Sequence, residues 1–92
     1  MRISSATLVM CLAGTITMVS AGLAAAQSCD QLWYERNSTY KSAGYCFKTA
    51  RAIATFGNAG CMYDSEYRLP LSPGQRERIA WMVRMEREFG CR

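Results

Sequence analysis

The sequence predicts an all-α fold: a small three-helix domain, up-down-up with a short middle helix, stapled by two disulfides. Three observations support this prediction. Apolar side chains recur at spacings of three and four residues in two long stretches, which is the period of an amphipathic helix. Helix-start residues precede these stretches and glycines follow them. Four cysteines occupy the segment after an apolar N-terminus, a pattern typical of disulfide-bonded secreted domains.

Residues 1–26 have the composition of a secretory signal peptide. Arg2 gives the basic start, an apolar run covers about residues 6–19, and residues 24–26 are the small alanines of a cleavage site. A membrane anchor is the alternative, but threonines and a serine interrupt the run, which is shorter than the roughly 20 residues that span a bilayer. We therefore expect a mature domain of residues 27–92, with no stable membrane insertion.

Removing 26 of the 92 residues leaves 66, too few for a self-sufficient hydrophobic core. Cys11 leaves with the signal, and an even set remains in an oxidising compartment: Cys29, Cys46, Cys61 and Cys91. A zinc site is the alternative interpretation. Because the chain has no histidine and no closely spaced cysteine pair, we expect two disulfides and neither a metal nor another cofactor.

The first helix is predicted over residues 30–42. Side chains at three- and four-residue spacings share one face of it, namely Leu32, Trp33, Arg36, Asn37 and Tyr40. Gly44 is expected to end this helix, because glycine tolerates the left-handed conformation of a helix C-cap. The aromatic residues 45–47 are expected to form an extended linker that turns the chain back.

A second, shorter helix is predicted from residue 50 to about residue 56, capped by Thr49 and stopped by the glycines of residues 57–60. Its buried side is expected to contain Ala50, Ile53, Ala54 and Phe56. No helical period holds over residues 61–71, so this stretch is expected to be an exposed loop. Its expected anchors are Met62, Tyr63 and Tyr67.

The third helix has the clearest start in the chain, with Ser72 as N-cap, Pro73 at the first helical position and Gln75 two positions later. It is predicted to continue to Phe89, and Gly90 stops it. The expected apolar side consists of Ile79, Met82, Val83, Met85 and Phe89, with Trp81 at its margin. Arginines alternate with glutamates on the other side, as on an ordinary solvated face.

The helix lengths favour one of the three possible disulfide pairings. A helix over residues 30–42, at about 1.5 Å per residue, puts Cys29 roughly 20 Å from Cys46, whereas a disulfide needs α-carbons within about 7 Å. The up-down-up path would bring Cys61 beside Cys29 and Cys91 beside Cys46. We therefore favour Cys29–Cys61 with Cys46–Cys91.

Residues 36–47 resemble the signature of the YARHG domain family, small bacterial extracellular domains whose pattern reads approximately R-N-E-I-Y-A-R-H-G-Y-x-F. The matching residues are Arg36, Asn37, Tyr40, Gly44, Tyr45 and Phe47. The likeness extends over about residues 29–90, although Ser42 and Ala43 replace the Arg-His of the family name. The resemblance implies a helical extracellular domain with no established activity, and the four cysteines suit a short periplasmic version.

Catalysis is not predicted. The chain has no histidine, and cysteines in disulfides cannot act as nucleophiles, so the common nucleophile–base pairs are missing. Carboxylates remain in the 61–71 loop and on the third helix, as Glu86 and Glu88, but both are expected at the surface. Neither has the burial that would tune it as a general acid.

The candidate site is the cluster Trp33, Arg36, Asn37, Tyr40, Gly44 and Tyr45, with Tyr63 beside it. As a binding site, the Arg36 fork would hold a carboxylate or phosphate while Trp33 or Tyr40 stacks on a ring. As a structural hub, Arg36 and Asn37 would instead bond the carbonyls left over at Gly44 and in the 57–60 turn. The structural interpretation is favoured.

Together these features predict a non-enzymatic, secreted or periplasmic, disulfide-stabilised interaction module of the bacterial cell envelope. Loss of Arg2 lowers the net charge from +4 to +3, a mild value that does not point to nucleic acid. The expected partner is an envelope component, either a protein or a wall polymer. The alternative is a secreted inhibitor of an envelope enzyme such as a cell-wall hydrolase, with residues 64–68 as the inserting loop.

Overall fold

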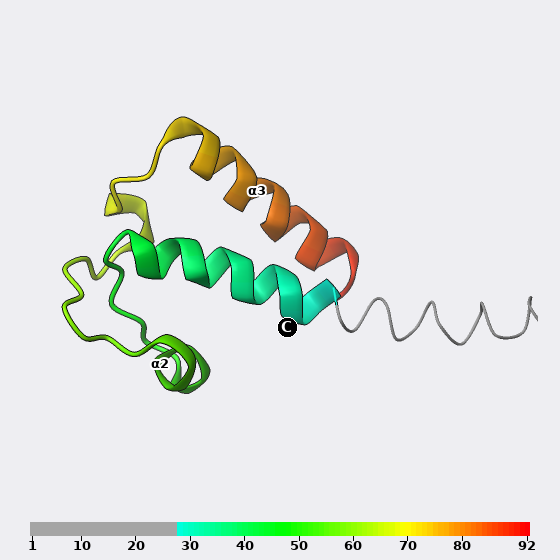
Figure 1. Cartoon of the computed structure of the whole chain (residues 1–92). Helices are drawn as coiled ribbons and strands as arrows, with labels where there is room; N and C mark the ends of the chain where they lie inside the picture. Colours follow the sequence, from blue (N-terminus) through cyan, green and yellow to red (C-terminus); the bar gives the residue numbers. More distant parts are fainter. Residues whose placement is uncertain (1–27) are drawn as a thin grey trace, which may run out of the picture.

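The computed structural model describes residues 28–92, which form three helices and one short 3-10 turn (Figure 1). Residues 28–42 are helical, and the later elements are α2 (Ala50–Phe56), η1 (Glu66–Arg68) and α3 (Pro73–Glu88). The all-α, three-helix prediction is confirmed, and the described residues include no strand. The predicted signal peptide of residues 1–26 lies outside the described residues.

Both later α-helices begin at the predicted caps. The Ser72 hydroxyl accepts a hydrogen bond from the Gln75 backbone at 3.1 Å, and the Gln75 side chain accepts one from the Ser72 backbone at 2.9 Å. Pro73 follows the cap, where no amide hydrogen is needed. At α2, the Thr49 hydroxyl accepts from the Ala52 backbone at 3.2 Å. These bonds satisfy amide groups that a helix start otherwise leaves unpaired.

Helix 28–42 and α3 run in opposite directions, so the predicted up-down-up path is wrong. The start of helix 28–42 is joined to the end of α3, and the two helices lie side by side (Figure 1). The physical reason is the length of α2. Its seven residues extend about 10 Å, less than half the length of helix 28–42, so α2 is too short to return the chain and α3 does so instead.

The disulfides are Cys29–Cys91 and Cys46–Cys61, with α-carbon separations of 5.5 Å and 5.1 Å. All four cysteines pair, as predicted, but the favoured pairing of Cys29–Cys61 with Cys46–Cys91 is wrong. That pairing assumed that the short second helix, whose bounds were predicted correctly, would carry the chain back along the whole of helix 28–42. With α2 so short, residues 46–61 form a small closed loop, and the antiparallel α3 brings the other two cysteines together.

A short extended segment links the two halves of the domain. Tyr45 and Tyr63 form a parallel β-bridge, in which the Cys46 backbone donates to the Tyr63 carbonyl at 2.8 Å. The Gly44 carbonyl accepts bonds from the backbones of Met62 and Tyr63 at 2.7 Å and 3.0 Å. The extended linker predicted for residues 45–47 is confirmed, and its partner is the stretch that follows Cys61.

The core lies where helix 28–42, α3 and the connecting segments meet. Its buried apolar side chains are Leu32, Tyr40, Phe47, Ala52, Leu69, Ile79 and Met82. The predicted inner face of α3 is largely confirmed, although Trp81 and Phe89 are about half exposed. For α2 the prediction holds only at Phe56, which packs against the core; Ala50, Ile53 and Ala54 are exposed, and the buried residue is Ala52. Fewer than two turns of an alanine-rich helix give no clear apolar face.

We expect Gly44→Ala to lower the free energy of unfolding by about 1–2 kcal/mol, because Gly44 has φ +94°, a backbone conformation that costs a side chain roughly this much. The added methyl would also lie 3.4 Å from Met62 and Tyr63 atoms. Urea unfolding of the oxidised protein measures the change. Gly74→Ala is the matched control: Gly74 lies in α3 with room for a methyl group, so this variant should be slightly more stable.

Candidate functional site

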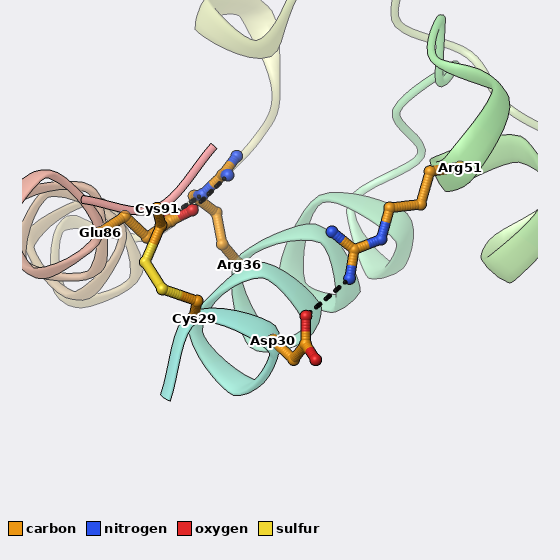
Figure 2. The surroundings of a disulfide bond; sticks show 6 residues. All are labelled: Cys29, Asp30, Arg36, Arg51, Glu86 and Cys91. Atoms are coloured by element: carbon orange, nitrogen blue, oxygen red, sulfur yellow. Dashed lines mark hydrogen bonds and ion pairs between the residues drawn. A yellow bond between two sulfur atoms is a disulfide. The ribbon is translucent and has the colours of Figure 1, made fainter. Parts of the chain in front are cut away.

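Arg36, the centre of the predicted site, is bound by a carboxylate of the same chain. Its Nε and Nη2 donate to the two carboxylate oxygens of Glu86 at 2.7 Å and 2.9 Å, a bidentate pair beside the Cys29–Cys91 disulfide (Figure 2). The side chains of Arg36 and Glu86 are only 21% and 14% exposed. The prediction that Glu86 lies on a solvated face is therefore wrong. The hydrogen bonds from Arg36 to Glu86 raise the pKa of Arg36.

Asn37 is buried, and its partners differ from those predicted. Its Nδ2 donates to the Trp33 carbonyl at 2.9 Å, one turn back in the same helix. The carbonyls assigned to Arg36 and Asn37 find other donors: Lys41 Nζ donates to the Gly57 carbonyl at 3.2 Å, and Gly44 accepts from backbone amides. The predicted hydrogen bonds to these carbonyls are therefore wrong.

Asn58 supplies the side-chain hydrogen bonds that the turn after α2 needs. Its Oδ1 accepts from the Phe47 backbone at 2.7 Å, and its Nδ2 donates to the Phe47 carbonyl at 2.9 Å. The two bonds fix the linker against the 57–60 turn. Asn58 was missed from sequence because asparagine in a glycine-rich turn already has an ordinary local explanation.

Tyr40 connects helix 28–42 to the connecting segments. It is only 6% exposed, and burial raises the pKa of its hydroxyl; the nearby Glu66 carboxylate raises it further, while Arg36 opposes the effect. The neutral hydroxyl is therefore the favoured form in the folded protein. Arg36, Tyr40 and their two carboxylate neighbours link helix 28–42 to η1 and α3.

Because the pKa of Tyr40 is higher folded than unfolded, its contribution to stability is complete below about pH 10 and is lost as the pH rises through the folded value. We expect the urea midpoint of the wild type to fall as the pH rises above about pH 10. Tyr40→Phe should start lower at neutral pH but fall less steeply. Parallel slopes for the two proteins would contradict the assignment.

Six aromatic rings form a continuous chain across the helices, and Tyr40 is at one end of it, with its ring centroid 5.6 Å from that of Tyr45. Phe56, at the end of α2, lies within 6 Å of three of them: its ring centroid is 5.9 Å from Trp33, 5.2 Å from Tyr34 and 5.3 Å from Phe47. Tyr45 continues the chain, with its ring 5.3 Å from Phe47. These contacts hold α2 against helix 28–42 and keep the aromatic side chains in fixed positions.

Five of the six predicted site residues line one cavity of about 220 Å³, which we call the signature cavity. Its lining consists of Trp33, Arg36, Asn37, Tyr40, Tyr45, Phe47, Lys48, Thr49, Ala52 and Glu66. Lys48 and Thr49 are exposed, so the cavity reaches the surface. Gly44, the sixth residue, shapes the turn behind it. The structure thus brings the predicted residues together and adds Lys48 and Glu66 to them.

A second, larger hollow lies on the other side of Trp33, between helix 28–42 and α2. This Trp33–Tyr34 cleft has a volume of about 490 Å³ and is lined by Asp30, Gln31, Trp33, Tyr34, Glu35, Arg51 and Thr55. Arg51 crosses it, with its Cζ 3.7 Å from the Trp33 ring centroid and its Nη2 3.2 Å from Asp30 Oδ1 (Figure 2). The Arg51 side chain is still 51% exposed, and the sequence did not indicate its contacts because they join two separate helices.

The 61–71 stretch is anchored by residues other than those predicted. Of the three expected anchors only Tyr63 is partly buried, because Met62 is 73% and Tyr67 is 84% exposed. Leu69, which the sequence did not single out, is only 1% exposed and belongs to the core. Met82 also belongs to the core. Over residues 28–92 no three acidic, histidine or cysteine side chains gather as metal ligands would. In the same part of the chain, no helix has the length and apolar character to cross a bilayer.

Comparison with protein-family models identifies the YARHG domain over residues 9–87, well over half of the chain. The match begins within the segment expected to be a signal peptide. Comparisons with curated proteins and with solved structures found no match. YARHG is an extracellular-type domain, and two disulfides in so small a domain indicate an oxidising compartment. With its signature residues gathered around one cavity, the chain belongs to the YARHG domain family.

Proposed function

We propose that the protein is a non-enzymatic interaction module of the bacterial cell envelope, secreted or periplasmic, whose partner is a wall polymer. The observation that carries the proposal is the pair of preformed hollows that Trp33 lines, whose aromatic walls are fixed by ring contacts such as that of Trp33 with Phe56. Ligand sites are usually concave, aromatic and largely formed before binding. The two hollows are of this kind. A domain this small has too little core to keep its clefts rigid, and the two disulfides supply that rigidity.

The groups with reactive potential are already engaged within the chain. The cysteines of the mature domain are paired, the chain has no histidine, and Arg36 and Glu86 neutralise each other. An exposed surface with hydrogen-bonding and aromatic groups, and without an activated nucleophile, favours binding over chemistry. The Arg36–Glu86 pair supports a structural role for Arg36 and leaves Trp33 and Tyr34 as the better contact residues.

Cosedimentation tests the proposal. The oxidised protein, recovered from the envelope of an expressing bacterium, is mixed with insoluble wall sacculi and, separately, with anionic and zwitterionic lipid vesicles. We expect saturable binding to sacculi and none to zwitterionic vesicles. A protein that stays in the supernatant with every envelope fraction would overturn the proposal. N-terminal sequencing of the same material tests the cleavage site, with Gln27 as the expected first residue.

One observation favours the second candidate, an inhibitor of a cell-wall hydrolase. Tyr67 projects from η1 with 84% of its surface exposed, on a turn fixed by the Ser65 cap and, further back, by the Tyr45–Tyr63 bridge. Rigid loops with an exposed side chain suit insertion into an active-site cleft. Stoichiometric inhibition of a wall hydrolase, lost in Tyr67→Ala, would support this function in place of polymer binding.

A further inference from the structure

We propose that the Trp33–Tyr34 cleft binds the sugar rings of an uncharged glycan strand, an inference that rests on the proposed binding to a wall polymer. The cleft combines an exposed aromatic ring, a ring of hydrogen-bonding groups and a balanced set of charges. The aromatic ring disfavours fully polar ions, the mixed hydrogen-bonding groups disfavour ligands that only accept hydrogen bonds, and the balanced charges disfavour polyanions and cationic peptides. Together they leave a neutral, hydroxyl-rich molecule with apolar ring faces.

The aromatic surface comes from Tyr34. Its side chain is 53% exposed, yet the ring is fixed, because it packs on Phe56 with a centroid separation of 5.2 Å. A large ring that is rigid but not needed in the core gives contact area at little cost in conformational entropy. The C–H face of a pyranose packs on such a ring, whereas a fully polar ion gains nothing from it.

The hydrogen-bonding groups surround this ring. Asp30 and Glu35 offer carboxylate oxygens, Gln31 an amide, Thr55 a hydroxyl and Arg51 a guanidinium. Both donors and acceptors are therefore present at one edge of the aromatic surface. Sugar hydroxyls donate and accept at once, so they match such a mixed lining better than a ligand that only accepts, such as phosphate.

The charges of the cleft are compensated within the chain. Asp30 pairs with Arg51 at 3.2 Å, and Glu35 pairs with Arg78 at 3.0 Å. Because each carboxylate has its own arginine, the cleft has no unpaired charge that would require a charged ligand. An uncharged glycan fits this balance, whereas a polyanion or a cationic peptide would have to break one of the pairs.

The cleft is also organised before the ligand arrives. Arg51 is held from two sides, by Asp30 and by the face of Trp33, and its carbonyl accepts from the Thr55 hydroxyl at 2.8 Å. The volume of the cleft, about 490 Å³, lies within the range typical of small-molecule sites. Side chains that are already placed lose little freedom on binding, so even a short oligosaccharide is expected to bind measurably.

Tryptophan fluorescence tests the proposal directly. Trp33 and Trp81 are the two tryptophans of the chain, and Trp81 lies outside the cleft on α3, so Trp81→Phe leaves Trp33 as the only reporter. The probe is a soluble oligosaccharide of N-acetylglucosamine, with a sulfated polysaccharide as the charged comparison. We expect saturable change in Trp33 emission with the neutral oligosaccharide and none with the sulfated one.

Two variants and a matched control locate the site. Tyr34→Ala should weaken binding by about tenfold or more, and Gln31→Ala, an exposed position that the core does not use, should weaken it severalfold. Tyr67→Ala removes an exposed tyrosine that does not line the cleft and should leave binding unchanged. Melting curves check that each variant is folded, and Gln31→Ala decides the question if Tyr34→Ala is unstable.

The outcomes separate the two proposals. If sacculi bind but the neutral oligosaccharide does not change Trp33 emission, the cleft assignment is wrong and the envelope function stands. The same holds if binding survives both Tyr34→Ala and Gln31→Ala, or if only the sulfated polymer binds. If neither sacculi nor oligosaccharide binds, both proposals fall.

Discussion

Removing the Cys29–Cys91 disulfide is expected to lower the free energy of unfolding by about 4 kcal/mol. This bond closes a loop of 62 residues, and in the chain-entropy model the stabilisation grows with the logarithm of loop length. The bond between Cys46 and Cys61 closes only 15 residues and should contribute about 3 kcal/mol. Since small domains are stable by only about 5–15 kcal/mol, either loss is a large fraction.

Paired serine variants measure both effects. Cys29→Ser with Cys91→Ser should have a lower urea midpoint than Cys46→Ser with Cys61→Ser, and reduction of the wild type with dithiothreitol should lower it further than either. The two double variants also keep one disulfide each, so no free thiol is left to rearrange. Equal stability of the oxidised and reduced protein would contradict a disulfide framework.

Replacing Arg36 with alanine is expected to destabilise the domain by about 2–4 kcal/mol. The variant removes a bidentate, largely buried pair and leaves the Glu86 carboxylate in a partly desolvated place without its partner. If Arg36 served only to hold a ligand, its removal would leave the melting midpoint nearly unchanged. The measurement therefore separates the structural role from the binding role.

Arg78→Ala is the matched control for this experiment. Arg78 pairs with Glu35 at 3.0 Å, but both side chains are more than half exposed, so its loss should cost less than about 1 kcal/mol. A double variant, Arg36→Met with Glu86→Leu, should recover part of the loss, because no charge is then left unpaired. Arg36→Ala and Arg78→Ala with the same small effect would contradict the role assigned to Arg36.

Local features of this chain could be predicted from its sequence. The caps at Thr49 and Ser72, the turn at Gly44 and the shared face of helix 28–42 each depend on neighbours within a few residues. The inner face of α3 could also be predicted, because its sixteen residues repeat the apolar pattern several times. These are the features that periodicity and side-chain chemistry determine directly.

The long-range features could not be predicted in the same way. The bounds of α2 were predicted correctly, but the assumption that so short a helix returns the chain was wrong, and it led to the wrong direction for α3 and the wrong disulfide pairing. The partner of Arg36 was missed because Glu86 is 50 residues away and sits among charged neighbours. Arg51 over Trp33 was missed for the same reason, so the larger cleft was not anticipated.

The antiparallel arrangement of helix 28–42 and α3 is central to every site described above. It brings Glu86 to Arg36 and fixes the face of helix 28–42 that remains free to form the two hollows with α2. The Cys29–Cys91 disulfide (Figure 2) covalently joins the start of helix 28–42 to the segment that follows α3, as this arrangement requires. Any other pairing would require α3 to end elsewhere.

Disulfide mapping of the oxidised protein tests this arrangement most directly. Trypsin cleaves after lysine and arginine, and such residues separate the four cysteines, so each lies on a different peptide. Mass spectrometry without reduction should find the peptide of Cys29 joined to that of Cys91, and the peptide of Cys46 joined to that of Cys61. Peptides joined as Cys29 with Cys61 and Cys46 with Cys91 would contradict the antiparallel fold and the sites built on it.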